Sequence, residues 1–362
     1  WSGVESPAMP ASPDVLFAGG GAAGHIYPGL AVAEQLRRRM PRAIVTFAGA
    51  GQPRQRYVVS HAGYHYTKIP SQPAPQNPLA ALRFVSDNIA GYCAARWMLR
   101  EQQVSLVVGL GGYTSAAVVR AAIARGVPVI LLEQNAIPGR TTRWLSRDSS
   151  LICAGFEEVR PHLHVGAPVA MTGNPARPEF ERLYARRKSA APKGSDSGPR
   201  QRRLVILGGA GGARSLNELM PAVLRDLGSR IDNWQVVHQT GEGQLVETEA
   251  RYEKLGSTAL AVSFIDEIAA VLFASDAVIC RAGGTTLAEL ALAGIPPLLV
   301  PYPHATDDHQ SANAKVFHAA GACRLVDETA HQGNLQNALT REVDHLLTDA
   351  AAREEMARNM RT

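Results

Sequence analysis

The sequence predicts an α/β protein with two Rossmann-like domains whose parallel sheets face each other across a cleft. Apolar, strand-like runs alternate with segments of helical periodicity along the chain, as in parallel sheets covered by helices. The pattern stops in a polar, basic stretch over residues 179–203 and then restarts. A chain of 362 residues is also long for a single core. We therefore expect domains over 14–178 and 204–345, joined by a linker or mobile loop.

The first half contains the expected elements in alternating order. Residues 15–18 form an apolar strand that leads into GGGAAGH, and Pro28 suits the first position of a helix that runs to about Arg39. Further strands are expected at 43–48, 106–108 and 129–132, with GLGGYTS and a helix to about Arg125 between the last two. Glycine turns therefore follow two of these strands directly.

The second half repeats this order. A strand at 204–207 leads into GGAGGAR and a helix over 216–227, and short strands begin near Val236 and Ala261. A strand at 278–280, the turn Gly283-Gly284, a helix over 285–293 and a strand that ends at Val300 form a βαβ unit. We also expect a last helix over 346–362 that could return to the N-terminal domain, and disordered or tag-derived residues at 1–13.

The composition is that of a soluble enzyme with anionic partners. Hydrophobic residues make up 46% of the chain and charged residues 19%, and the net charge is +5 without dense Lys/Arg runs. Diphosphates or an acidic lipid surface are therefore favoured, and nucleic acid is not expected. The four cysteines form no C-x-x-C pair, which argues against zinc and a disulfide framework and fits a reducing cytoplasm. No signal peptide and no membrane-spanning run is visible.

Residues 278–313 predict a nucleotide-sugar site. The turn at Gly283-Gly284 follows a strand and offers free backbone N–H groups at a helix N-terminus, which suits a phosphate. Glu289, one turn further on, is a candidate to hold a ribose diol. The alternative is structural, because Thr286-x-x-Glu289 is also a capping-box pattern.

Two other phosphate-binding classes are disfavoured by missing residues. Gly19-x-Gly21-x-x-Gly24 fits the dinucleotide fingerprint, but the second strand ends in AGAGQ, without the carboxylate that would hold the ribose of NAD. The same loop is no P-loop, since His25-Ile26 stands where Lys-Ser/Thr is required. A tight turn that only packs a strand on a helix would explain one glycine loop. Four such loops in matched places indicate ligand binding.

Several polar side chains beside these turns are candidate functional residues. His25 lies at a helix N-terminus and is either a general base or a residue that bonds backbone or phosphate. Arg177 and Arg214 are candidate partners of a diphosphate. A polar loop that contacts a sugar is expected at His304, Asp307, Asp308 and His309. No metal site is expected, because no Asp-x-Asp pair is present, and HExxH and GxSxG are absent as well.

Residues 79–100 predict a basic amphipathic helix. Its apolar positions at helical spacing are Leu82, Val85, Ile89 and Cys93, with Arg83, Arg96, Trp97 and Arg100 among them. This face either packs on the core or forms an apolar, basic-rimmed patch on a membrane surface.

Eight motifs in order resemble one glycosyltransferase family. They are GGGAAGH with the following P-G-L-A-x-A (19–33), GLGGYTS (109–115), LEQNAIPGRTTRWL (132–145), GNPAR (173–177), GGAGGAR (208–214), FID (264–266), RAGGTTLAEL (281–290) and DDHQSANA (307–314). Over about residues 14–345 the chain is similar to the MurG family. These peripheral-membrane enzymes add N-acetylglucosamine to the lipid-linked muramyl-pentapeptide precursor of peptidoglycan.

The resemblance implies the GT-B fold and an inverting transfer from UDP-N-acetylglucosamine to the 4-hydroxyl of the muramyl sugar (lipid I to lipid II). It implies no metal or other cofactor, and a location at the cytoplasmic face of the cell membrane. The expected partners are UDP-N-acetylglucosamine, the undecaprenyl-pyrophosphoryl muramyl-pentapeptide and an anionic membrane surface.

The resemblance also implies roles for individual residues. His25 is the catalytic base or orients the acceptor, Ile265 meets the uracil through its backbone, and Gln310 contacts the sugar. The implied donor-site residues are Ala22, Ala23, Gly24, Asn135, Arg177, Ala210, Ile265, Gly284, Thr285, Thr286, Leu287, Ala288, Glu289 and Gln310. The implied acceptor-diphosphate residues are Gly20, Gly21, Gly111, Gly112 and Tyr113.

Two loops depart from the family pattern. Ala210 and Gly211 stand where the family usually has Ser and Gln, and Ala22 stands where Thr is common. A lost neutral hydrogen bond is worth about 0.5–1.5 kcal/mol, so the donor would rely on backbone N–H groups here. The alternative functions are a GT-B transferase with another UDP-sugar or acceptor, and a non-catalytic nucleotide-sugar binding protein. GLGGYTS and LEQNAIPG favour the peptidoglycan lipid as acceptor.

Overall fold

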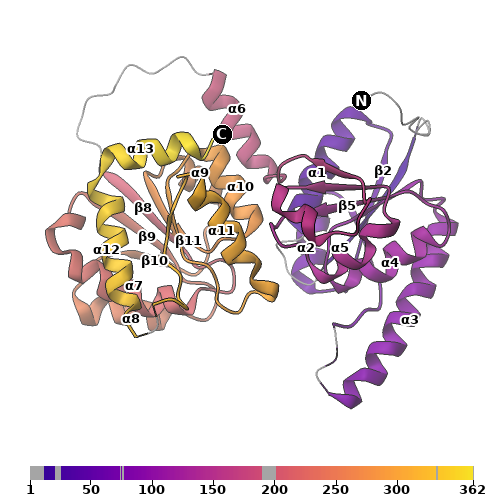
Figure 1. The fold of residues 1–362 in the computed structure, drawn as a ribbon, viewed down its shortest axis with the longest axis horizontal. Coiled ribbons are helices and arrows are strands. Elements are labelled where there is room, and N and C mark those ends of the chain that lie inside the picture. Colours follow the sequence, from indigo (N-terminus) through magenta and orange to yellow (C-terminus); the bar gives the residue numbers. More distant parts are fainter. Residues whose placement is uncertain are drawn as a thin grey trace. The chain divides into compact units, whose positions relative to one another are not determined.

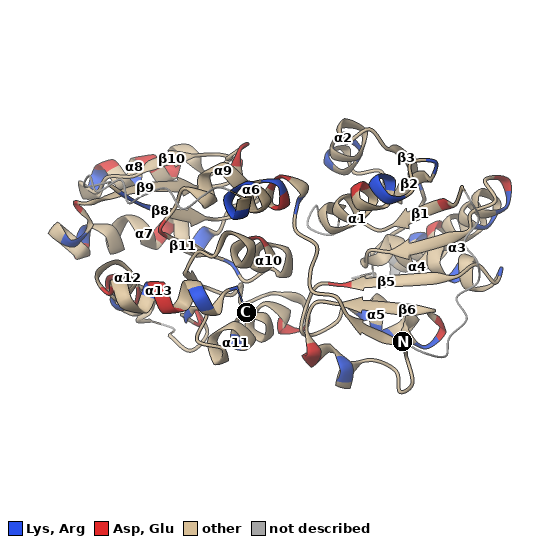
Figure 2. Ribbon diagram, turned by 90° about the horizontal axis from the view of Figure 1, so that it is seen from above, with Lys and Arg blue, Asp and Glu red and all other residues tan. Residues whose placement is uncertain are grey.

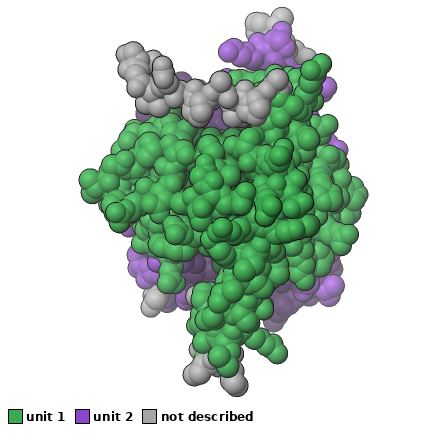
Figure 3. Space-filling view, turned by 90° about the vertical axis from the view of Figure 1, so that its right-hand side faces the viewer, with its two compact units in different colours: residues 1–177 green, residues 178–362 purple. Residues whose placement is uncertain are grey.

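The computed structural model describes residues 12–20, 26–73, 75, 77–189, 201–331 and 333–361. The chain divides into two compact units, residues 1–177 (unit 1) and 178–362 (unit 2), which Figure 3 shows in different colours. Each unit holds one parallel β-sheet with helices around it (Figure 1). The prediction of two α/β domains with parallel sheets is confirmed.

Unit 1 has a parallel sheet in the order β3-β2-β1-β4-β5-β6-β7. Its strands are β1 (Asp14–Ala18), β2 (Ile44–Gly49), β3 (His65–Lys68), β4 (Leu106–Gly109), β5 (Val129–Glu133), β6 (Leu151–Ala154) and β7 (Val169–Met171). Its helices are α1 (Ile26–Arg39), α2 (Pro53–His61), α3 (Pro78–Glu101), α4 (Tyr113–Ile123) and α5 (Arg140–Leu145). Alternate residues of β1 belong to two hydrophobic clusters, Phe17 to one and Leu16 to the other, so both faces of the sheet are buried.

Unit 2 repeats the order in its sheet, β10-β9-β8-β11-β12-β13. Its strands are β8 (Arg202–Leu207), β9 (Trp234–Gln239), β10 (Leu260–Val262), β11 (Ala277–Cys280), β12 (Pro297–Leu299) and β13 (Arg324–Leu325). Its helices are α6 (Pro178–Ser189), α7 (Arg214–Leu227), α8 (Leu245–Leu255), α9 (Ile268–Phe273), α10 (Gly284–Ala293), α11 (His309–Ala319), α12 (Leu335–Thr348) and α13 (Ala350–Asn359). Because Leu207 pairs with Cys280, the loops after β8 and β11 leave the sheet side by side.

The first part of the expected linker is a helix, α6. Glu179 and Glu181 lie in its first turn and basic residues in its last turn, which complements the helix dipole; the charges are visible in Figure 2. Phe180 is fully buried, and its ring lies 6.1 Å from that of Phe273 on α9. The basic, polar composition of residues 179–203 favoured a linker, whereas Phe180 anchors the first turn of this segment as a helix. Residues 190–200 lie outside the described part of the chain.

The C-terminal region forms two helices, where one over 346–362 was expected. Asp349 separates α12 from α13, and its side chain accepts a hydrogen bond from the Ala352 N–H as an N-cap. Met356 of α13 belongs to the hydrophobic core of unit 2, and Arg353 donates to the carbonyls of Leu346 and Leu347. Packing of this region on the N-terminal domain stays a prediction. In the described part of the chain, no helix combines the length and the apolar character needed to cross a membrane.

Candidate active site

The second glycine turn of unit 2 is built as the sequence predicts. Gly283 is the N-cap of α10, with φ −71° and ψ 138°, and α10 ends at Gly294 in the left-handed conformation (φ 64°). The helix is therefore bounded by two glycines, and its first N–H groups follow directly on the end of β11. A helix N-terminus of this kind suits an anionic group.

The position of the N-cap removes the structural alternative for Glu289. A capping box would require Thr286 as N-cap and Glu289 three residues later, but the N-cap is Gly283. Glu289 lies well inside α10 and is only 3% exposed. The capping-box interpretation is wrong, and the role of Glu289 at a ribose stays a prediction.

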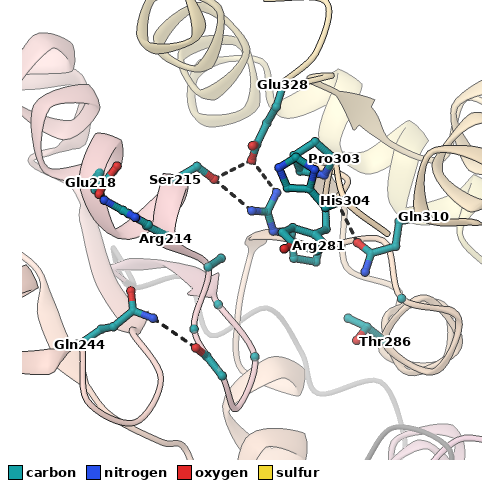
Figure 4. Close-up of a pocket in the computed structure, with 17 residues that line it drawn as sticks. Arg214, Ser215, Glu218, Gln244, Arg281, Thr286, Pro303, His304, Gln310 and Glu328 are labelled. Carbon is teal, nitrogen blue, oxygen red and sulfur yellow. Dashed lines mark hydrogen bonds and ion pairs between the residues drawn. The ribbon is translucent and has the colours of Figure 1, made fainter. Parts of the chain in front are cut away.

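A cavity of about 800 Å³ lies beside this turn, within unit 2 (Figure 4). It is bounded by three segments: the loop after β8, the turn before α10, and the loop between β12 and α11. The lining residues include Gly209, Gly211, Arg214, Ser215, Gln244, Arg281, Gly283, Thr286, Tyr302, His304, Gln310 and Glu328. The N-termini of α7 and α10 thus border the same cavity, as a diphosphate would need.

An arginine in the wall of this cavity connects the segments that border it. The Arg281 guanidinium donates to the carbonyls of Val300 (2.9 Å) and Pro301 (3.1 Å) and to the hydroxyl of Ser215 (3.0 Å). It pairs with the carboxylate of Glu328 at 2.5 Å, and the two side chains are 16% and 12% exposed. Ser215 donates to the same carboxylate (2.5 Å). Since Glu328 balances the charge of Arg281, the network fixes geometry more than it adds net positive charge.

The other predicted donor residues of unit 2 lie in or near this region. Gln310 lines the cavity, and its Oε1 accepts a hydrogen bond from the Tyr302 N–H (3.0 Å), which leaves the amide nitrogen to serve as a donor. Ile265 donates its N–H to Gln239 Oε1 at 3.3 Å, a long hydrogen bond that a base could displace. Leu287 is fully buried in the core, and its N–H donates to the Gly283 carbonyl at 3.0 Å. Ile265 and Glu289 do not line the cavity itself.

The sugar-loop candidates are arranged without a metal-binding cluster in the described part of the chain. His304 lines the cavity with its ring against Tyr302, and His309 Nδ1 pairs with the Thr306 carbonyl. Asp307 and Asp308 adopt positive φ angles of 53° and 54°. No group of three His, Cys, Asp or Glu side chains among the described residues is placed to hold an ion.

In unit 1 the predicted acceptor turn is a glycine pair with left-handed backbone. Gly111 and Gly112 have φ angles of 84° and 76°, and Gly112 is the N-cap of α4, which begins at Tyr113. Gly20 packs against the Gln55 side chain. Of the loop before α1, the predicted residues Gly21, Ala22, Ala23, Gly24 and His25 lie outside the described residues.

Asn135 is held by a buried carboxylate. Glu133 accepts hydrogen bonds from the N–H and the Nδ2 of Asn135 (3.1 and 3.2 Å) and from the N–H of Gly139 (3.1 Å). Burial raises the pKa of the Glu133 carboxyl, and hydrogen bonds from Thr142, Gly139 and Asn135 oppose that rise. Arg177 closes unit 1, and its guanidinium lies 5.2 Å from the ring centre of Tyr27.

Several residues of this site were not predicted from the sequence. Arg281 opens the quoted motif RAGGTTLAEL, but its position beside a glycine turn was the only signal. Its partner Glu328 lies 47 residues further on, and no local pattern links the two. Gln244 and Glu133 also had no assigned role.

Comparisons with known proteins agree with this geometry. Residues 15–150 match the glycosyltransferase family 28 N-terminal domain, and residues 203–362 match the glycosyltransferase family 28 C-terminal domain. The UDP-N-acetylglucosamine–N-acetylmuramyl-(pentapeptide) pyrophosphoryl-undecaprenol N-acetylglucosamine transferase of Geobacter sulfurreducens is 35% identical, covering 95% of this chain and 94% of that protein. The protein of the same name from Myxococcus xanthus is 36% identical, covering 91% and 84%.

A solved structure agrees as well. The crystal structure of Acinetobacter baumannii MurG superposes with a TM-score of 0.70 at 27% identity, and the match covers 96% of this chain and 94% of that one. It shares the GT-B architecture that the sequence predicts. With two matched domains, relatives above 30% identity over nearly the whole length and a common fold, the chain belongs to the MurG family of glycosyltransferase family 28.

Proposed function

We propose that this chain transfers N-acetylglucosamine from UDP-N-acetylglucosamine to the 4-hydroxyl of the lipid-linked muramyl-pentapeptide, with inversion at the anomeric carbon. The observation that carries the proposal is the cavity between the N-termini of α7 and α10, in the domain that matches the family's C-terminal half. Family membership supports both substrates.

The donor binds in unit 2. The N–H groups of the first turn of α10, over Gly284 to Thr286, and those of the loop around Ala210 hold the diphosphate, because both helix dipoles favour negative charge there. The backbone of Ile265 reads the uracil, and Glu289 holds the ribose hydroxyls. The amide nitrogen of Gln310 donates to the sugar.

The chemical step uses residues of unit 1. The acceptor 4-hydroxyl attacks the anomeric carbon in line, and its proton passes to His25 or to solvent beside it. UDP leaves as its charge is stabilised by the two helix N-termini and by Arg177. Gly111, Gly112 and Tyr113 receive the acceptor diphosphate at the N-terminus of α4.

The test is a transfer assay with labelled UDP-N-acetylglucosamine and a short-chain analogue of the lipid-linked muramyl-pentapeptide. Formation of a labelled, β-linked disaccharide lipid from UDP-N-acetylglucosamine, with none formed from labelled UDP-glucose, supports the proposal. Donor binding without any product would favour a binding-only protein or another acceptor. A His25→Asn enzyme with near-normal kcat would remove the assignment of the base.

We also propose that α3 attaches the protein to the cytoplasmic face of an anionic membrane. Its large apolar side chains are exposed where a core-facing helix would bury them: Leu82 74%, Val85 53%, Ile89 58% and Trp97 67%. Arg83, Arg96 and Arg100 are exposed beside them, and the opposite face packs Ala95, Met98 and Leu99 into unit 1. An apolar stripe with a basic rim is typical of interfacial helices.

A pair of matched variants tests this placement. Leu82→Glu should weaken sedimentation with phosphatidylglycerol vesicles several-fold, because it puts a charge among the inserted side chains. Val246→Glu is the control, since Val246 is 79% exposed on α8 of unit 2. Equal binding of both variants would remove α3 from the membrane contact.

A further inference from the structure

The loop after β8 is wedged against the segment that follows β9. A Cβ added to Gly212 would lie 2.3 Å from the Thr240 carbonyl oxygen and 2.5 Å from Gln244 Nε2, and Gly212 has a φ of 77°. A Cβ on Gly241 would lie 2.2 Å from the Gly212 nitrogen. The two backbones therefore touch, and glycine is required on both sides of the contact.

An amide chain links the same two segments. Asn217 Nδ2 donates to the Thr240 carbonyl (2.8 Å) and to Gln244 Oε1 (2.8 Å). Because Gln244 Oε1 is the acceptor, its Nε2 must point the other way, and it donates to the Gly211 carbonyl at 3.1 Å (Figure 4). Asn217 is 1% exposed, so the chain begins at a rigid, buried anchor on α7.

These contacts engage the backbone carbonyls of the loop and leave the N–H groups at its tip without partners in the described part of the chain. The carbonyls of Gly209, Ala210 and Gly211 accept from Gly212 N–H, Glu242 N–H and Gln244 Nε2 respectively. Within the described residues, the N–H groups of Gly209, Ala210 and Gly211 have no hydrogen-bond partner. Gly209 and Gly211 line the cavity, where a Cβ on either would meet nothing within 4 Å. With its carbonyls held back, the loop can offer its N–H groups to an anion.

We infer that Gln244, oriented by Asn217, is a positioning residue for the donor diphosphate. The tip of the loop is Ala210 and Gly211, and neither residue has a side chain that can bond a phosphate or brace the turn. Gln244 supplies that brace from outside the loop. This inference rests on the proposed function, because it assumes that the diphosphate binds in this cavity.

The experiment compares the affinities of UDP and uridine, measured as inhibition of the transfer reaction. Gln244→Leu should weaken UDP roughly tenfold, the effect of about one hydrogen bond, and leave uridine unchanged, because the base and ribose are held elsewhere. Gln244→Glu should weaken UDP further, since its charge would face the Gly211 carbonyl and the diphosphate. Glu249→Ala, exposed on α8, is the matched control.

A second variant distinguishes a local effect on the loop from a general loss of structure in unit 2. Ala210→Ser adds a hydroxyl to the loop, and in the Gln244→Leu background it should recover more UDP affinity than it adds to the parent protein. Equal losses for UDP and uridine in Gln244→Leu, or no loss for either, would overturn the inference. A parent protein that turns over donor but is not inhibited by UDP would instead contradict the proposed donor site.

Discussion

The first six strands of unit 1 and the six strands of unit 2 follow the same order, but the two units differ at the residue after the fourth strand, β4 in unit 1 and β11 in unit 2. In unit 1, β4 is followed by Leu110, which is fully buried and lies close to Gly19 and Gly29. In unit 2, β11 is followed by Arg281, which joins Ser215, Glu328 and two backbone carbonyls. The same turn is therefore supported by apolar packing in one unit and by a charged network in the other. Topology places the turn, and this single residue sets the chemistry beneath it.

Each unit has a glutamine near its first glycine loop, and the two glutamines make different contacts. Gln55 on α2 and Gln244 before α8 both lie just after the second strand of their unit. Gln55 is 1% exposed, accepts from the Tyr66 hydroxyl, and would lie 2.8 Å from a Cβ on Gly20. Gln55 therefore packs beside Gly20, whereas Gln244 donates to the Gly211 carbonyl. Among the described residues, the glutamine of unit 2 thus orients a loop carbonyl through a specific hydrogen bond.

Exchanging the residue types at Leu110 and Arg281 should have the largest effect on the stability of the two units. Leu110→Arg would bury an unpaired guanidinium, at a cost of several kcal/mol, and we expect unit 1 to lose its fold. Arg281→Leu should lower the free energy of unfolding of unit 2 by about 3 kcal/mol, because Glu328 is left without its partner. Urea denaturation followed by hydrogen exchange in each unit measures both.

The double variant Arg281→Leu/Glu328→Leu separates stability from binding. It should regain most of the stability, since no buried charge remains, but UDP affinity should stay about a hundredfold weaker because the walls of the cavity are no longer held in place. Normal UDP affinity in the double variant would show that the network only stabilises the fold.

Two neighbouring glycines of unit 2 should respond differently to alanine. Gly212→Ala puts a Cβ against the Thr240 carbonyl at a φ of 77°, and should cost at least about 2 kcal/mol of stability together with UDP affinity. Gly211→Ala places its Cβ in open space and should change stability by less than about 0.5 kcal/mol. Thermal unfolding with and without UDP tests the pair. Equal losses of stability in the two variants would contradict the close contact between Gly212 and the Thr240 carbonyl.

A buried histidine should make unit 2 the more acid-sensitive half. Burial lowers the pKa of His238 to about 4, from an ordinary value of 6.5, and the ring bonds the Tyr252 hydroxyl at 2.8 Å. The unfolded chain binds the proton first, so stability should fall by roughly 1.4 kcal/mol per pH unit between about 6.5 and 4 and then level off. His238→Phe should flatten this slope, because it removes the buried ring that takes up the proton on unfolding. An unchanged slope in His238→Phe would assign the acid sensitivity to other groups.

Ala210→Ser in the parent protein should have the smallest effect. The added hydroxyl stands in a loop whose N–H groups we propose to bind the diphosphate already, so UDP affinity should rise by no more than about tenfold. Inhibition by UDP measures the gain. A loss of affinity would mean that the hydroxyl competes with the backbone for the phosphate.

The sequence could predict what is local. The strands, the glycine turns at their carboxyl ends and the βαβ unit around α10 follow from apolar runs and from glycines near each other in the chain. The pairing of Arg281 with Glu328, and of Gln244 with Asn217, depends on segments that the sheet brings together, so periodicity gives no signal for either. Thr286-x-x-Glu289 fits the capping-box pattern, but that interpretation is wrong because the helix begins at Gly284, two residues before Thr286.

Hydrogen exchange of the parent protein with UDP alone tests the division between the two units most directly. We expect slower exchange over residues 208–212 and 284–289 of unit 2, and unchanged rates over 109–115 of unit 1 until the lipid acceptor analogue is added. Protection of 109–115 by UDP alone, with none over 208–212, would place the donor in unit 1 and contradict donor binding in unit 2.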